Sequence, residues 1–373
     1  MHNHIEIITT QQAAELVSHG GVISRHAFQC VDFRAIDAAA LADVTFKDCI
    51  FMGCRFSPDM RIRLDESNTA LTSLPVPYSV FRTTLYDAST LYSGYDYNCP
   101  STIAESYDYK IYQHYLKTGK RATDVAETLA RTLHDHSMSD ALHDFLSSYK
   151  DEDIVAIMGG HAMLRTDDVY RQVVDIAKSL TEQGKLMTTG GGPGAMEATH
   201  LGAWLAGRTN SEVDEALTIL KRYPSFTDKG WLSSAFEVMK RFPQKEFQSV
   251  GIPTWLYGHE PATPFATHIA KYFENSLRED GLLTIAKGGV IYTPGSAGTM
   301  QEIFQDAVQN HYLTVEYASP MAFLDVDYWT NELPVYPMLE ELQNRGRYRN
   351  LLLSISDDVT DIVQTILDFN PKN

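Results

Sequence analysis

The stretch Val290–Phe304 reads Val-Ile-Tyr-Thr-Pro-Gly-Ser-Ala-Gly-Thr-Met-Gln-Glu-Ile-Phe, and the rest of the chain is interpreted around it. A short β-branched and aromatic run ends at Pro294, and a loop of small residues follows. Met300, Ile303 and Phe304 then recur at helical spacing. This pattern predicts a strand, a tight loop and a helix. The first N–H groups of such a helix carry partial positive charge and can hold an anion such as phosphate.

The composition is that of a globular protein with a sizeable core, because 44% of the 373 residues are hydrophobic and 21% are charged. The net charge of −17 argues against a nucleic-acid polymer or an anionic membrane surface as partner, since both would repel it. No apolar run approaches the roughly 20 residues of a membrane helix, and no signal peptide is recognised. The four cysteines lack metal-type spacing, which favours reduced thiols in a cytoplasmic protein.

Residues 1–150 are predicted to form an N-terminal accessory region. Between Phe28 and Phe56 apolar side chains recur every five residues, as is typical of short pentapeptide-type β coils. Two ordinary alternating strands explain the same pattern equally well. A tyrosine-rich segment follows, and residues 121–149 are expected to form one or two amphipathic helices.

Residues 151–373 alternate between strand-like and helix-like segments, which predicts an α/β fold: a Rossmann-like parallel sheet with helices on both faces. Besides the opening stretch, we expect strands at 154–158, 186–189, 254–257, 321–326 and 351–355, and helices at 169–183, 195–206, from about 262 to 283, and 359–369. A polar insertion at about 207–249 is expected to hold two short helices.

Three glycine-rich loops follow strands of this domain. Ligands of open α/β sheets bind beyond the carboxyl ends of the strands, so the loops are expected to converge on one crevice. The expected binding residues are Gly159, Gly160, Gly190, Gly191, Gly192, Pro193, Gly194, Met196, Glu197, Pro294, Gly295, Ser296, Ala297, Gly298 and Thr299. The spacing Gly190-x-Gly192-x-x-Ala195 also matches a dinucleotide fingerprint, but it follows the second strand of its unit, which disfavours a dehydrogenase.

The runs Thr189–Ala198 and Pro294–Glu302 resemble the two motifs of the LOG family, GGGxxGxM and PGGxGTxxE. That family comprises nucleotide 5′-monophosphate phosphoribohydrolases, and the resemblance covers roughly residues 153–325. It implies a Rossmann-like dimer that binds a nucleoside monophosphate and hydrolyses its N-glycosidic bond, releasing the base and ribose 5-phosphate. The chain departs from the motif at Ser296, where the family has glycine. A serine there would be strained if the position required a positive φ.

Arg278 and Glu302 are the expected catalytic residues. The resemblance places the family's arginine at Arg278, where it would bind the 5′-phosphate. A carboxylate at Glu302 would stabilise the positive charge that develops on the sugar as the bond breaks. The alternatives are that Arg278 only pairs with a neighbouring acid, and that Glu302 only complements the helix dipole. Glu197 is equally compatible with a second active-site carboxylate and with an ordinary helix acid.

Two other functions are considered. The chain could be a non-catalytic nucleotide sensor that uses its N-terminal region as output. A pyridoxal-phosphate decarboxylase is disfavoured, because neither Lys271 nor Lys287 stands in a loop suited to a Schiff base. The favoured expectation is a cytoplasmic, homo-oligomeric hydrolase of nucleoside 5′-monophosphates, a nucleosidase with no metal site and no organic cofactor.

Overall fold

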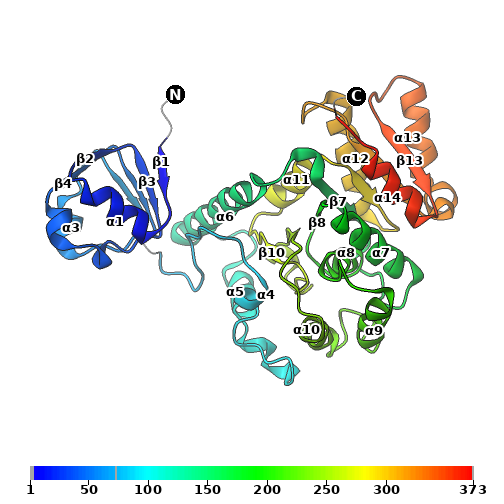
Figure 1. Ribbon diagram of the computed structural model, residues 1–373, viewed down its shortest axis with the longest axis horizontal. Coiled ribbons are helices and arrows are strands. Elements are labelled where there is room, and N and C mark those ends of the chain that lie inside the picture. The colour runs from blue at the N-terminus through cyan, green and yellow to red at the C-terminus, as the bar shows by residue number, and fades with distance from the viewer. Residues whose placement is uncertain (1–3, 72–73, 372–373) are drawn as a thin grey trace. The chain divides into compact units, whose positions relative to one another are not determined.

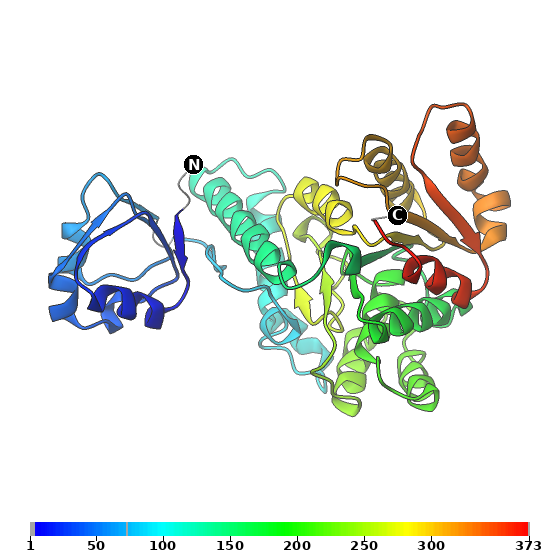
Figure 2. The same ribbon diagram turned by 45° about the horizontal axis from the view of Figure 1, so that its top comes forward.

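The computed structural model describes residues 4–71 and 74–371 (Figures 1 and 2). The chain divides into two compact units: unit 1 contains Met1–Leu85 and His114–Phe145, and unit 2 contains Tyr86–Gln113 and Leu146–Asn373. The segment Tyr86–Gln113 therefore belongs to the same unit as the C-terminal half, although it precedes residue 150. Within the described ranges, no helix combines the length and the apolar character needed to cross a membrane.

Unit 1 is built on parallel strands that stack one coil above the next. In one sheet the strand order is β1-β3-β5-β6, and β2 pairs with β4 in a second sheet. Its elements are β1 (Ile5–Ile7), α1 (Thr10–Ser18), β2 (Gly21–Ser24), β3 (His26–Gln29), the short 3-10 helix η1 (Phe33–Ala35), α2 (Ala38–Ala42), β4 (Val44–Lys47), β5 (Ile50–Met52), α3 (Pro58–Arg63), β6 (Thr69–Leu71) and nearly all of α6 (Val125–Leu146).

The interior of these coils explains the five-residue periodicity. Phe28 pairs with Phe51 in neighbouring strands, and their rings stack with centroids 5.0 Å apart. The buried Cys49 thiol donates to the carbonyl of Ile23 at 3.4 Å, and Cys54 donates to the carbonyl of Phe28 at 3.3 Å. Each coil thus contributes aromatic rings and small thiols to one continuous core. The five-residue pattern therefore corresponds to stacked β coils, and the alternative of two ordinary alternating strands does not form.

Unit 2 contains the expected Rossmann-like sheet, with seven parallel strands in the order β10-β9-β8-β7-β11-β12-β13. The chain runs outward from β7 to β10, returns to β11 on the other side of β7, and continues to β13. Its elements are α4 (Ala88–Leu91), η2 (Pro100–Glu105), α5 (Tyr107–Thr118, shared with unit 1), η3 (Asp151–Asp153), β7 (Ile154–Met158), α7 (Asp168–Glu182), β8 (Leu186–Thr189), α8 (Ala195–Trp204), α9 (Asn210–Leu220), α10 (Trp231–Arg241), β9 (Ser249–Gly251), η4 (Trp255–Tyr257), β10 (His268–Ile269), α11 (Asn275–Ile285), β11 (Val290–Tyr292), α12 (Ala297–Tyr312), β12 (Pro320–Leu324), the π-helix η5 (Tyr328–Glu332), α13 (Val335–Asn344), β13 (Leu352–Ser356) and α14 (Val359–Leu367).

The central strands are buried on both faces, as a parallel sheet covered by helices requires. Every residue of β7 is buried. Val155 and Ile157 pack in one core with residues of α7, α8 and α14, while α11 contacts the sheet through β7 and packs against α12 (Figure 2). The reversal of strand order between β7 and β11 leaves the loops that follow these two strands side by side, which is where such sheets bind ligands.

Two expected elements were wrong. Residues 254–257 do not form a strand: the strand is β9, and Trp255–Tyr257 is a 3-10 helix. The apolar character of this stretch reflects burial of Trp255, whose indole Nε1 donates to Asp108 at 2.9 Å. The long helix from about 262 to 283 is also absent, because His268–Ile269 pairs with β9 as strand β10 and only Asn275–Ile285 is helical.

Candidate functional site

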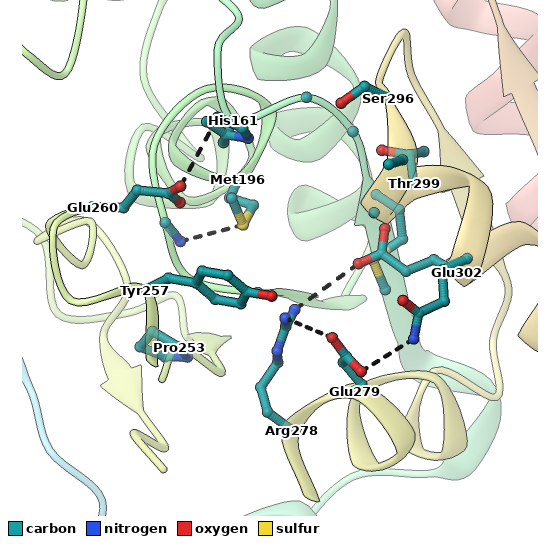
Figure 3. A pocket seen from close by; sticks show the side chains of 18 of the residues that line it. His161, Met196, Pro253, Tyr257, Glu260, Arg278, Glu279, Ser296, Thr299 and Glu302 are labelled. Atoms are coloured by element: carbon teal, nitrogen blue, oxygen red, sulfur yellow. Dashed lines mark hydrogen bonds and ion pairs between the residues drawn. The ribbon is translucent and has the colours of Figure 1, made fainter. Parts of the chain in front are cut away.

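A cavity of about 430 Å³ lies at the carboxyl ends of the strands (Figure 3). All three glycine-rich loops contribute to its wall. The sequence-predicted residues that line it are Gly159, Gly160, Gly190, Gly192, Met196, Arg278, Ser296, Ala297, Gly298, Thr299 and Glu302. Gly191, Pro193, Gly194, Glu197, Pro294 and Gly295 are not among the lining residues. The first set can contact a ligand, and the second can act only by supporting it.

Two glycines allow the loops to pack directly against one another. A side-chain carbon at Gly159 would lie 1.9 Å from the hydroxyl oxygen of Thr293. Gly194 has a φ of +69°, and a side-chain carbon there would lie 2.2 Å from the carbonyl oxygen of Gly160. Both positions exclude even a methyl group, since carbon and oxygen atoms do not approach so closely. The loops after β7, β8 and β11 therefore form one fused surface.

The first turn of α12 faces this cavity. Ser296 is its N-cap residue and has a φ of −114°, so the serine that replaces the motif glycine is not in the left-handed region and is not strained there. Its side chain makes no capping hydrogen bond, and no other side chain among the described residues bonds to the first N–H groups of the helix. Tyr328, from the π-helix, donates its hydroxyl to the carbonyl oxygen of Gly295 and so fixes the loop that precedes the helix.

Arg278 and Glu302 do meet in this pocket. Their closest nitrogen and oxygen atoms, Nη1 and Oε1, are 4.0 Å apart, and their side chains are 14% and 20% exposed. Arg278 also donates to the side chain of Asn275 at 3.0 Å and pairs with Glu279 at 3.4 Å. Within residues 4–71 and 74–371 the Glu302 carboxyl receives no hydrogen bond. Burial raises its pKa to about 7, with Arg278 opposing that shift and Glu279 adding to it.

Several residues of the opposite wall of the cavity were not predicted from the sequence. His161, Pro253, Tyr257 and Glu260 line the cavity, and Tyr257 lies across it from Ser296, Thr299 and Glu302 (Figure 3). Tyr257 ends the 3-10 helix whose first residue, Trp255, is anchored to Asp108. The available signal was the run of glycine, histidine, glutamate and proline at 258–261. That run directly follows the segment predicted as a strand, so the same rule would have placed it at the carboxyl edge of the sheet.

Glu197, which the sequence left open as a site carboxylate, is a core residue. It is fully buried. Its carboxylate accepts hydrogen bonds from Arg165 Nε at 2.9 Å, from Arg165 Nη2 at 2.5 Å and from the Tyr170 hydroxyl at 2.9 Å. The same guanidinium donates to Ser234 and to the Trp231 carbonyl of α10. This network ties the helical insertion to α8, and it does not line the pocket.

Comparison with known proteins adds a distant likeness of fold. No family model matches the chain, and no curated protein matches it. The molybdenum cofactor binding protein from the phototrophic bacterium Rippkaea orientalis is 14% identical, with a TM-score of 0.34, over 57% of this chain and 96% of that one. The Chlamydomonas rheinhardtii Moco carrier protein is also 14% identical, with a TM-score of 0.35, over 57% of this chain and 94% of that one. At this similarity neither ligand nor activity transfers to this chain.

These findings correct the family assignment made from the sequence. No family model matches the chain, and the similar solved structures are a molybdenum cofactor binding protein and a Moco carrier protein. The LOG assignment was therefore wrong, and with it the expected nucleosidase activity and the classification as a hydrolase. The nucleotide-sensor alternative is not supported either. The physical reason lies in the motifs, since their glycines Gly194 and Gly295 are needed for close packing of the loops, and such packing does not by itself specify a reaction.

Proposed function

We propose that the pocket of unit 2 is a binding site for a small organic phosphate, and that the protein acts by holding such a ligand. The observation that carries this proposal is the uncapped first turn of α12, which opens into a cavity that also contains Arg278. A helix N-terminus and a guanidinium are the two groups best suited to a phosphate. The cavity of about 430 Å³ is of the size that encloses a small organic molecule.

The remainder of the ligand would lie against the opposite wall. Tyr257 is 41% exposed although it lines the cavity, and its ring is 5.9 Å from the Arg278 guanidinium carbon. An exposed aromatic ring beside a cation offers a surface for a flat organic group. Glu302, which has no hydrogen-bond partner among the described residues, can accept from a hydroxyl or N–H of the ligand or, when protonated, donate to it.

Calorimetry with pairs of ligands that differ in a phosphate group tests this proposal. We expect flavin mononucleotide and ribose 5-phosphate to bind at least ~10-fold more tightly than riboflavin and ribose, because the phosphate supplies the charge-assisted contacts. The molybdenum cofactor, after which the two similar proteins are named, is tested as a further ligand. Arg278→Gln should lose at least ~10-fold in affinity for the phosphorylated members. Arg345→Gln, at an exposed pair on α13, is the matched control. Equal affinity of phosphorylated and unphosphorylated partners would sink the proposal.

Anion binding is expected to weaken as pH rises from 6 to 8. The pKa of Glu302 is raised to about 7, so its carboxyl is mostly neutral at the lower pH and mostly ionised at the higher one, where it repels an anion. Sulfate is the suitable probe because it does not titrate in this range. Its affinity should fall several-fold in the wild type, whereas Glu302→Gln should show a flatter profile and bind more tightly at pH 8. Identical slopes in the two proteins would contradict this role.

A cytoplasmic location and a homo-oligomeric state remain predictions. The location is supported by the four cysteines, all of which are free thiols. Size-exclusion chromatography with light scattering would test the oligomeric state.

A further inference from the structure

Glu260 stands between two histidines at the edge of the pocket. His161 comes from the loop after β7, and His259 and Glu260 come from the loop after η4. The Nε2 atoms of His161 and His259 lie 3.9 Å and 3.6 Å from the same carboxylate oxygen, Oε1 of Glu260. Figure 3 shows His161 and Glu260 pointing toward one another. Two histidines from separate loops therefore flank one carboxylate oxygen, although their own nitrogens are more than 4.8 Å apart.

The ligating atoms of these residues are not engaged elsewhere. Across the described residues, none of the three side chains makes a hydrogen bond. The Glu260 side chain is only 17% exposed, whereas His161 and His259 are 49% and 61% exposed. The carboxylate is thus partly desolvated and fixed in the wall, while both imidazoles have room to rotate toward it. A partly buried carboxylate without a hydrogen bond is costly unless a cation compensates it.

We propose that His161, His259 and Glu260 bind a divalent transition-metal ion of the Zn²⁺ type. Two imidazole nitrogens and one carboxylate oxygen are a common ligand set for such ions, whereas Mg²⁺ and Ca²⁺ prefer oxygen ligands alone. Ligand atoms bound about 2.0–2.2 Å from a tetrahedral ion lie about 3.3 Å from one another. The two histidine–carboxylate separations need to close by a few tenths of an ångström, whereas the two imidazole nitrogens lie more than 4.8 Å apart and must rotate toward each other by more than ~1 Å.

The position of this site determines what the ion can contact. Both His161 and Glu260 line the cavity, and a side-chain carbon at Gly192 would lie 3.8 Å from Glu260 Oε2. Three protein ligands leave a tetrahedral ion one open position, which an anionic ligand of the pocket could occupy. Because neither imidazole hydrogen-bonds to an acceptor in the described chain, the outer support that strengthens metal sites by 10–100-fold is missing. We expect affinity in the micromolar range.

The test is a Zn²⁺ titration of the metal-free full-length chain by calorimetry, with no organic phosphate present. Excess Mg²⁺ is added to compete at purely acidic clusters, such as the Glu6, Asp140 and Asp144 group in unit 1. His259→Ala and Glu260→Gln remove one ligand each, and His19→Ala, at an exposed histidine of unit 1, is the matched control. Thermal unfolding of each variant verifies that it is folded.

Wild type and His19→Ala should bind one equivalent of Zn²⁺ at least ~10-fold more tightly than His259→Ala and Glu260→Gln. With Co²⁺ as the probe, the same two proteins should develop a visible absorption band that the other two lack. If all four proteins bind Zn²⁺ with the same number and strength of sites, the inference is overturned. Its failure would leave the proposed phosphate site untouched, because that site is measured separately with organic phosphates in metal-free protein.

Discussion

Ser296→Asp is expected to weaken binding of an organic phosphate at least ~30-fold, which corresponds to about 2 kcal/mol. Ser296 is the N-cap of α12 and its side chain makes no hydrogen bond to the helix start. An aspartate there would present its own carboxylate to the same N–H groups and repel a second anion. The substitution should not destabilise the fold, because aspartate is among the preferred N-cap residues.

Ser296→Asn is the matched control, since asparagine has the shape of aspartate and lacks its charge. Its affinity for flavin mononucleotide should stay within a few-fold of the wild type, and both variants should unfold at or above the wild-type temperature. Calorimetry at fixed ionic strength gives the affinities. Equal affinity of Ser296→Asp and Ser296→Asn would show that the phosphate is bound elsewhere than at the start of α12.

Glu197→Gln is expected to lower the free energy of unfolding of unit 2 by about 3–5 kcal/mol. Arg165 and Glu197 are 1% and 0% exposed, so the substitution leaves a guanidinium buried without a counter-charge. The Arg165 guanidinium also lies 4.7 Å from the Trp231 ring and donates to the carbonyl of Trp231. Loss of its anchor should therefore loosen the insertion as well as α8.

Urea denaturation followed by tryptophan fluorescence is the suitable measurement. The chain has four tryptophans, Trp204, Trp231, Trp255 and Trp329, and all of them lie in unit 2. Asp214→Asn is the control, because it breaks the exposed pair with Arg171, in which the aspartate is 63% exposed. Exposed pairs contribute about 0–1 kcal/mol, so this variant should unfold almost as the wild type does. A loss below about 1 kcal/mol for Glu197→Gln would mean that Arg165 finds other compensation.

The central strands of the unit 2 sheet could be predicted from the sequence because they are short, largely apolar or β-branched, and followed by a glycine-rich loop. Ile154–Met158 and Leu186–Thr189 have the predicted bounds in the structure. The stacked coils of unit 1 gave a five-residue periodicity because side chains in equivalent positions recur in each coil, but two alternating strands explained that periodicity equally well. Both signals are local: they depend on which side chains face the core within one element.

The pocket residues that the sequence did not predict are positioned by contacts between distant parts of the chain. The 3-10 helix that carries Tyr257 is placed by Trp255, whose indole is held by Asp108, and Asp108 also accepts from the buried Lys271 at 2.7 Å. No periodicity links residues 108, 255 and 271. The same limitation explains Glu197, which looked like a site acid because it follows a glycine loop, while its partner Arg165 lies 32 residues earlier.

The packing at Gly159 and Gly194 has a consequence for how this pocket can diversify. Because no side chain fits at either position, the close contact between the loops at the base of the cavity requires glycine at both. The rim is different: Tyr257, His161 and His259 are substantially exposed and can be exchanged without disturbing the sheet. Among descendants of this chain, new ligand preferences should therefore arise through changes in the rim residues, while the two glycines stay unchanged.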